Sequence, residues 1–305
     1  MSGIILDFIG GRPRQVEPPD AGRDVRIRKT HWLVASLLLL SFCSGARYAP
    51  TIRFPYLWLG IQGFGGDIDK QQLREPSGIC YHARRGTLFV VGDEGEVAEI
   101  EKDGTPIAHY MIKGDLEGIT VVPETGLLYI AVEGDDIILE FDPVKGEVRR
   151  RFPINRAFKG DPNFLQKQTD RFDNGIESLA FVPNPKHPEG GTFYVGNQWD
   201  PSMIMEVLVP LKSSLDAEAE AKIIRVLPFR MDDPAAMYYD PVTRRLNIVS
   251  DADNILVEVT LDGKMVKQYA FLGEDQEGLC RDDEGYLYIA QDNGGIIKVK
   301  DLRPR

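Results

Sequence analysis

The sequence predicts an all-β fold, a β-propeller with five four-stranded blades, and three observations lead to this prediction. Short runs of alternating, β-branched or aromatic residues occur throughout residues 47–305, as expected for half-buried strands. Turns rich in Gly, Asp, Asn and Pro separate the runs at hairpin spacing. Groups of four runs recur every forty to sixty residues or so, a spacing typical of propeller blades (about 40–50 residues).

Five segments align as the inner halves of the blades. Each opens on a step of acidic or small residues and continues through two hydrophobic runs into a polar turn. The segments are residues 76–95, 116–135, 176–200, 234–254 and 276–295. The fifth repeat ends near residue 300 after three runs, so we expect an N-terminal strand within residues 56–64 to complete it and close the ring. Six blades are the alternative, if residues 154–174 contain a degenerate blade.

Residues 1–46 have the features of a targeting segment ahead of the propeller domain, residues 47–305. Basic residues precede the apolar run WLVASLLLLSF, residues 32–42, and small residues follow it, as in a secretory signal peptide. The run is shorter than the roughly 18–20 residues of a spanning helix. An uncleaved signal anchor is the alternative, because the stretch before the run is long and basic. In both cases we expect an exported propeller, either periplasmic or attached to the plasma membrane with the propeller outside.

The negative charge of the chain indicates which kinds of partner it can bind. The net charge is −11 overall, and residues 47–305 carry 30 Lys and Arg against 43 Asp and Glu. An acidic body of this kind excludes nucleic acid, whose phosphates need clustered Lys and Arg, but it suits a cation. No nucleophile motif occurs and no His aligns with the acidic positions described below. The sequence therefore predicts no catalytic residue.

Two cysteines occupy matching positions in the first and fifth repeats, which are neighbours in a closed ring. Cys80 and Cys280 form either a disulfide clasp between these blades or two buried free thiols. A disulfide requires Cα atoms about 4.4–6.8 Å apart, and matching positions alone do not establish that distance.

Aligned repeats place acidic residues at the start of the first strand. In a propeller this strand lines the axis, so Glu117, Glu177 and Glu277 are expected to converge. Buried like charges repel one another unless a cation neutralises them, and Ca²⁺ takes six to eight oxygen ligands. These residues are thus candidate Ca²⁺ ligands. The structural alternative is that each Glu accepts hydrogen bonds from a neighbouring blade. The full column is Ser77, Glu117, Glu177, Ala235 and Glu277.

A second polar column follows the second strand of each repeat. Asp251 and Asp292 stand in DADN and DNGG, beside further oxygen donors, and are added to the candidate metal ligands. We interpret the other members as residues that satisfy the turn backbone. The column is Asp93, Glu133, Gln198, Asp251 and Asp292.

A third column lies midway along the third strand and is interpreted as structural. A polar residue between apolar neighbours is what a half-exposed strand predicts. The column is Glu99, Glu140, Glu206, Glu258 and Lys298.

Two segments carry a resemblance to a known family. DLEGITVVPETGLLYIAVEGDDIILEFD, residues 115–142, and DQEGLCRDDEGYLYIAQDNGGIIKVK, residues 275–300, resemble the SdiA-regulated, YjiK-like proteins of bacteria. These are exported or membrane-anchored propellers, distantly similar to NHL-repeat propellers. The resemblance covers about residues 55–300 and implies five blades, a bound calcium and no established biochemical activity. The family has a Glu in the first strand of its blades. Glu117, Glu177 and Glu277 match that pattern, whereas Ser77 and Ala235 depart from it.

A weaker resemblance points to an enzyme. DDPAAMYYDP, residues 232–241, and the segment 277–296 are similar to parts of β-propeller phytases, which are calcium-dependent phosphatases. That resemblance implies that Asp232, Asp233 and Glu277 help to hold metal ions that bind substrate phosphate. The chain departs from the phytase pattern by being shorter and by lacking a basic cluster for a polyphosphorylated ligand.

The sequence therefore supports three hypotheses. The first is an exported or membrane-anchored calcium-binding propeller that acts as a non-catalytic binding or interaction module for an unidentified ligand or protein partner. The alternative is a calcium-dependent phosphoesterase or esterase on the same scaffold. The third is a metal-free scaffold in which the glutamates only join the blades.

Overall fold

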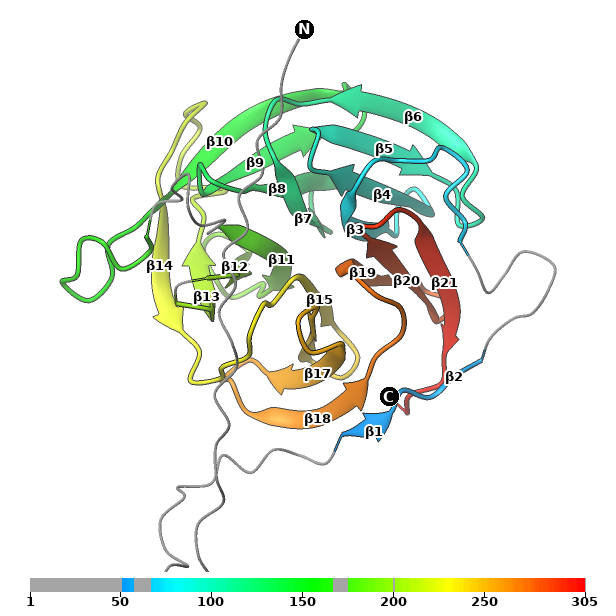
Figure 1. The fold of residues 1–305 in the computed structure, drawn as a ribbon. Coiled ribbons are helices and arrows are strands. Elements are labelled where there is room, and N and C mark those ends of the chain that lie inside the picture. Colours follow the sequence, from blue (N-terminus) through cyan, green and yellow to red (C-terminus); the bar gives the residue numbers. More distant parts are fainter. Residues whose placement is uncertain (1–50, 58–66, 167–174, 200, 305) are drawn as a thin grey trace, which may run out of the picture. The chain divides into compact units, whose positions relative to one another are not determined.

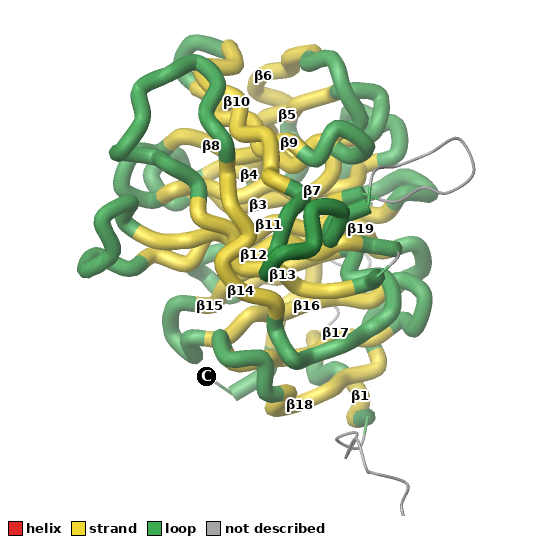
Figure 2. Tube along the Cα trace, turned by 90° about the vertical axis from the view of Figure 1, so that its left-hand side faces the viewer, coloured by secondary structure: helices red, strands yellow, loops and turns green. Residues whose placement is uncertain are grey.

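The computed structural model describes residues 51–57, 67–166, 175–199 and 201–304. Within these ranges the chain forms 21 strands and no helix, as Figure 2 shows by colour. None of the described residues forms a helix long and apolar enough to cross a membrane. The proposed targeting segment, residues 1–46, lies outside the described residues, so its assignment stays a prediction.

Blades of four antiparallel strands surround a central axis (Figure 1), which confirms the propeller; hydrogen bonds between blades and the added β1 group these strands into sheets of four, four, five and eight strands. The first blade contains β3 (Pro76–His82), β4 (Thr87–Gly92), β5 (Glu96–Ile100) and β6 (Pro106–Met111). The second contains β7 (Leu116–Val122), β8 (Leu127–Val132), β9 (Ile137–Asp142) and β10 (Glu147–Asn155). The third contains β11 (Ile176–Pro183), β12 (Gly191–Asn197), β13 (Met203–Leu208) and β14 (Ala221–Val226). The fourth contains β15 (Ala236–Asp240), β16 (Arg245–Ser250), β17 (Ile255–Thr260) and β18 (Met265–Ala270). The fifth contains β19 (Gln276–Arg281), β20 (Tyr286–Gln291), β21 (Ile296–Asp301) and β2 (Tyr56–Leu57).

The N-terminal strand closes the ring as predicted. β2 pairs antiparallel with β21, the last strand of the chain. The described residues form five blades, and residues 167–174, part of the segment considered for a sixth, lie outside them. Just before β2, β1 (Ile52–Arg53) adds to the fourth blade by pairing parallel with β18. Phe54, between the two strands, is 1% exposed, and its ring packs edge-on against Tyr269 at 5.5 Å. The N-terminal strands therefore secure two neighbouring blades.

Blades 2 and 3 are also joined at their outer edges. β10 and β14 pair in parallel through Ile154 and Ala221, which makes one eight-stranded sheet. The insertion before β14 is held by the second blade, because Arg150 Nη1 donates to the carbonyl of Ser214 at 2.9 Å. Pairing covers two edges that are otherwise open to solvent and to other chains.

Glycines allow the inner strands of neighbouring blades to approach one another closely. A Cβ added at Gly118 on β7 would lie 2.4 Å from the backbone nitrogen of Leu179 on β11. A Cβ at Gly78 on β3 would lie 2.1 Å from the carbonyl oxygen of Glu117. These contacts involve backbone atoms, which cannot turn aside as a flexible side chain can. The glycine of the repeated Glu-Gly step is therefore a packing requirement around the axis.

The same step carries a β-bulge in four of the five blades. The register shifts between Pro76 and Gly78, between Leu116 and Ile119, between Ile176 and Leu179, and between Gln276 and Gly278. A bulge places one extra residue in a strand and re-aims its side chain. The extra residue here falls at the first acidic column, where each inner strand begins.

Four of the five members of the third column are buried and Glu206 is partly buried, which corrects the half-exposed strand expected from the sequence. Glu99 and Glu140 are each 1% exposed, and Glu258 is 5% exposed. Each Glu of the column pairs with an arginine of its own blade. The pairs are Arg85 with Glu99, Arg150 with Glu140, Arg225 with Glu206, and Arg245 with Glu258. In the fifth blade Lys298 takes this position, and its Nζ donates to the carbonyl of Lys102 at 2.7 Å. The column is structural, as predicted, but through buried ion pairs.

The close packing at the axis predicts that adding one methyl group at Gly118 destabilises the fold strongly. We expect Gly118→Ala to lower the free energy of unfolding by about 3 kcal/mol, the upper end of overpacking costs. Gly86→Ala is the control, because its Cβ would meet nothing within 4 Å and only its positive φ adds strain, worth about 1 kcal/mol. Urea denaturation measures both variants. Equal costs would contradict the packing role assigned to Gly118.

The buried ion pairs predict a non-additive double mutant. Arg150→Met leaves Glu140 charged and buried, and removing one partner of such a pair costs about 3–5 kcal/mol. Adding Glu140→Leu removes the unpaired charge and is expected to restore most of that loss. Denaturation of the two single variants and the double variant forms the cycle. Additive losses would show that Glu140 and Arg150 do not depend on one another.

Candidate metal centre

A cavity of about 300 Å³ opens at the end of the axis where the inner strands begin. Every residue that lines it carries a side-chain oxygen. The lining residues are Ser77, Asp93, Asp115, Glu117, Glu133, Glu177, Gln198, Glu277 and Asp292. Seven of these nine are carboxylates.

The three predicted glutamates are brought together at this cavity. Each is the second residue of an inner strand: Glu117 on β7, Glu177 on β11 and Glu277 on β19. Glu117 and Glu177 are 7% and 6% exposed, and Glu277 is half-buried. The bulge at each position and the ring of inner strands (Figure 1) account for the convergence. The three glutamates therefore converge on the axis, as the sequence predicted; their binding of Ca²⁺ stays a prediction.

Residues directly after the second strands contribute more of the lining than the sequence indicated. Asp292, a predicted ligand, lines the cavity, but so do Asp93, Glu133 and Gln198, which had been assigned to turns. Asp251, the other predicted ligand of this column, is not among the lining residues, and its Oδ1 accepts a hydrogen bond from the Gln276 backbone at 2.8 Å. Asp93, Glu133 and Gln198 thus line the cavity together with Asp292, because the ring brings distant turns to one mouth.

One further acidic column was not recognised in the repeats, although the phytase resemblance had named one of its members, Asp233. It lies two residues before the first column, where Asp115 lines the cavity. Backbone hydrogen bonds place it beside the second column, since Glu133 N donates to Asp115 O at 3.0 Å and Asp292 N donates to Asp275 O at 2.9 Å. The signal was present in the repeats, because four of five have an acid at this position. The position holds Glu75, Asp115, Gly175, Asp233 and Asp275.

The closest group of oxygens lies on the first and second blades. Asp93, Asp115 and Glu117 each offer one carboxylate oxygen, and these oxygens all lie within 4.8 Å of one another. Asp93 also accepts a hydrogen bond from the hydroxyl of Ser77. Only Glu117 of the predicted ligands belongs to this group, so the sequence located the cavity better than it located the ligands within it.

Burial and mutual repulsion raise the pKa values of these acids. Burial is the largest cause for Glu117, Glu177 and Glu277, and for each of them the neighbouring carboxylates raise the pKa further. Burial likewise raises the pKa of Asp93 to about 6, against a hydrogen bond from Ser77 that lowers it. All these shifts favour the neutral form, which is what crowded acids without a counter-charge do.

No cation of the described residues neutralises this group. The lining contains no Lys, Arg or His, and Glu117, Glu177 and Glu277 form no ion pair with the basic residues in the described ranges. The buried glutamates of the third column differ, since each has an arginine. The protein can therefore pair buried glutamates, and it does not do so at the axis.

The donor set fits a hard divalent cation. Carboxylate and amide oxygens are the ligands that Ca²⁺ prefers, and the described lining offers no thiol or imidazole for a softer metal. Gln198 Oε1 and Asp292 Oδ1 are buried and have no hydrogen-bond partner among the described residues. Buried polar atoms without partners are rare in folded proteins, and here they belong to two residues that line the cavity.

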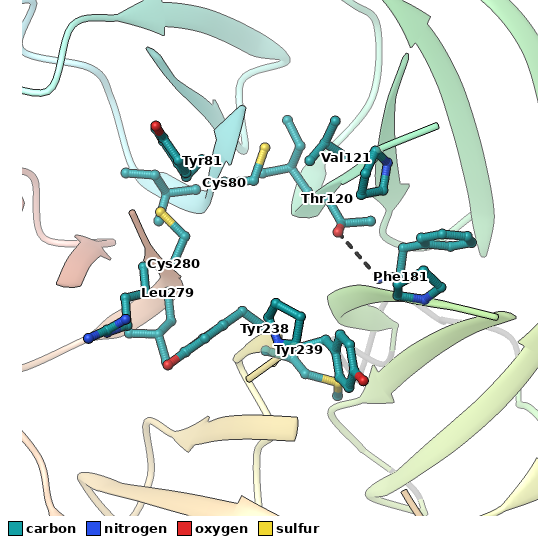
Figure 3. Close-up of a pocket in the computed structure, with 16 residues that line it drawn as sticks. Cys80, Tyr81, Thr120, Val121, Phe181, Tyr238, Tyr239, Leu279 and Cys280 are labelled. Atoms are coloured by element: carbon teal, nitrogen blue, oxygen red, sulfur yellow. Dashed lines mark hydrogen bonds between the residues drawn. The ribbon is translucent and has the colours of Figure 1, made fainter. Parts of the chain in front are cut away.

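The opposite end of the inner strands has a different character. A second cavity of about 180 Å³ lies there, lined by all five blades and including Tyr238, Phe181 and Leu279 (Figure 3). Cys80 and Cys280 stand on its wall as buried free thiols, and burial raises the pKa of both. Of the two possibilities left open for these cysteines, the structure has the free thiols.

Comparison with known proteins adds the family. A family model described as SdiA-regulated matches residues 59–293. The chain belongs to the SdiA-regulated family. No curated protein matches this chain. Among solved structures, that of a protein of unknown function from Bacteroides caccae is similar at 15% identity with a TM-score of 0.43, covering 73% of this chain and 72% of the other.

The raised pKa values predict how the stability of this member of the family depends on pH without added metal. The folded state of Asp93 holds its proton up to about pH 6, whereas an ordinary Asp loses it near pH 3.9. The folded state thus binds more protons in this window, and stability is lost as pH rises through it. We expect the melting temperature in EDTA to fall as the pH rises from about 4 to about 6.

A variant separates this effect from other titrations. Glu117→Gln removes one of the crowded charges, so it is expected to melt higher than the natural protein at pH 8 and to show a shallower decline. Glu94→Gln, at an exposed acid beside Asp93, is expected to leave the decline unchanged. A melting temperature in EDTA that increases as the pH rises from about 4 to about 6 would contradict the account.

Proposed function

We propose that this protein is an exported calcium-binding β-propeller that acts as a non-catalytic binding module. The observation that carries the proposal is the axial cavity, which gathers seven carboxylates and no basic residue among its described lining. Ca²⁺ would offset their repulsion and take oxygens from carboxylates, amide and water. Asp93, Asp115 and Glu117 are the proposed first ligands, because their oxygens lie closest together.

A non-catalytic role is favoured over the phosphoesterase alternative by the composition of the same cavity. A metal-dependent phosphoesterase needs cationic groups that hold the substrate phosphate beside the ion. The described lining has none, and the carboxylates that one Ca²⁺ leaves unneutralised would repel an anion. Asp232, one of the residues implied by the phytase resemblance, is exposed.

Export and partner binding rest on other parts of the chain. The features of residues 1–46 support export, with a cleaved signal or an anchor as the two possibilities. The insertion before β14 is the part of the chain that we propose as a partner surface: Arg150 holds its base, and the Leu215 side chain at its tip is 91% exposed.

Thermal melting in EDTA and in Ca²⁺ tests the metal. A ligand that binds only the folded state at a hundredfold excess over its Kd adds about 2.7 kcal/mol of stability. For a domain of this size that corresponds to roughly 5–10 °C in melting temperature. We expect this rise for the natural protein and for the control Glu94→Gln.

Glu117→Gln, at one of the three proposed first ligands, distinguishes a metal ligand from a residue that joins blades. If the residue is a metal ligand, the variant is expected to have a higher melting temperature than the natural protein in EDTA, because one repelling charge is gone. It is also expected to lose most of the increase in melting temperature that Ca²⁺ causes. As a blade-joining residue it would melt lower in both conditions. No rise of the natural protein in Ca²⁺ would overturn the calcium proposal.

A further inference from the structure

The cavity at the opposite end of the axis is separate from the candidate metal centre. Its volume is about 180 Å³, and residues of the inner strands of all five blades line it. Figure 3 shows the labelled side chains, among them Thr120, Tyr239 and Cys280, arranged in a ring around open space. The inner strands thus leave room for a small molecule at the end of the axis that the acids do not occupy.

The lining of this cavity carries no unpaired charge, in contrast to the acidic cavity. Among the described residues that line it there is no Asp, Glu, Lys or His. The charged side chain in this set is Arg281, and its Nε donates to Asp301 Oδ2 at 3.0 Å. A charged ligand would lose its hydration in the cavity without gaining a counter-charge. The cavity therefore favours a neutral molecule.

Aromatic rings form much of the wall, and their polar ends are engaged elsewhere. The Tyr81 hydroxyl donates to Asp283 Oδ1 at 2.9 Å, and the Tyr238 hydroxyl accepts from Arg303 Nη2 at 2.9 Å. These tyrosines therefore present mainly ring surface to the cavity. Further apolar side chains in the wall are Phe181, Met237 and Leu279. Surfaces of this kind bind apolar ligands by burying their area and by contact between rings.

The Thr120 hydroxyl has a hydrogen that it can donate to a ligand. Its Oγ1 accepts a hydrogen bond from the Phe181 backbone at 3.3 Å, drawn as the dashed line in Figure 3. A threonine hydroxyl accepts and donates at the same time, and the hydrogen bonds among the described residues include none that Thr120 Oγ1 donates. A polar group of this kind fixes the orientation of a ligand in an apolar pocket, so the ligand has a hydrogen-bond acceptor.

The volume of the cavity limits the ligand to a single ring. A cavity of roughly 150 Å³ holds benzene, whereas sites for drug-sized ligands measure about 300–1,000 Å³. At about 180 Å³ the cavity accommodates one ring with a short substituent.

We propose that this cavity binds a small neutral aromatic molecule with one hydrogen-bond acceptor, of the size and chemistry of an aryl ketone. The ring of the ligand packs among Phe181, Tyr238 and Leu279, and its acceptor receives the hydrogen bond of the Thr120 hydroxyl. The site gives the proposed binding module a class of ligand, and it does not depend on Ca²⁺.

Ligand-observed NMR titration of the full-length protein in EDTA tests the inference with acetophenone as the probe. We expect a Kd on the order of 1 mM or lower, as ligand efficiency allows for so small a molecule. Ethylbenzene, which has nearly the same shape and no acceptor, is also expected to bind. Benzoate and tetramethylammonium, which carry opposite charges, are expected not to bind.

Two variants at Thr120 locate the ligand. Thr120→Val keeps the shape and removes the hydroxyl, so it is expected to weaken acetophenone about fivefold, the effect of one hydrogen bond, and to leave ethylbenzene unchanged. Thr120→Phe fills the cavity and is expected to abolish the binding of both probes. Val144→Phe is the control, because Val144 is 82% exposed in the turn between β9 and β10, and it is expected to bind both probes as the natural protein does.

The inference is overturned if the natural protein binds neither acetophenone nor ethylbenzene, or if Thr120→Phe still binds them. Tighter binding of benzoate or tetramethylammonium than of acetophenone contradicts the neutral class of ligand. Equal weakening of both probes by Thr120→Val contradicts the hydrogen bond. Each of these results leaves the calcium proposal standing, because the titrations contain EDTA. If the circular dichroism spectrum shows that Thr120→Phe is unfolded, Val121→Trp replaces it under the same expectation.

Discussion

The close approach of the inner strands around the axis is the constraint on which the rest of the structure depends. A propeller blade cannot cover both of its faces alone, so each inner strand must pack against the next. In this protein the distance is so short that Gly78 and Gly118 have no room for a methyl group. The same positions carry bulges, which turn the residue before the glycine toward the axis. Tight packing and convergence of side chains are thus two results of one local geometry.

That geometry creates two classes of buried glutamate in one chain. Glu140 represents the first class: it accepts hydrogen bonds from Arg150 Nε at 3.0 Å and from the Tyr129 hydroxyl at 2.6 Å, so its charge is neutralised inside its own blade. Glu117 represents the second class, whose neighbours are other acids. A buried ion pair is neutral and needs no ligand. The acids at the axis, in contrast, keep a negative charge that the described residues do not neutralise and that a bound cation could offset.

The sequence predicted the fold well and the site in part, for reasons that differ from residue to residue. Strand period and turn chemistry are local, so the repeats showed the five blades and even the closure by Tyr56–Leu57. Glu117, Glu177 and Glu277 could be placed because the position of an inner strand follows from the repeat. Asp93 was misjudged because its neighbours come from other blades, and no local pattern shows which turns meet. Glu140 was judged half-exposed because its arginine lies ten residues away on the next strand.

Because the N-terminal strand closes the ring, ring closure is a late step in the folding of the propeller. β2 is among the first parts of the domain to be synthesised, and its partner β21 is the last, so the ring cannot be completed until the whole chain is available. Pairing across such a separation is slow, because the loop entropy is lost before the contacts form. Glu277 lies on the last blade to be synthesised, so its carboxylate is the last of the three axial glutamates to become available. The repulsion among these acids is therefore complete only once the whole chain has been made.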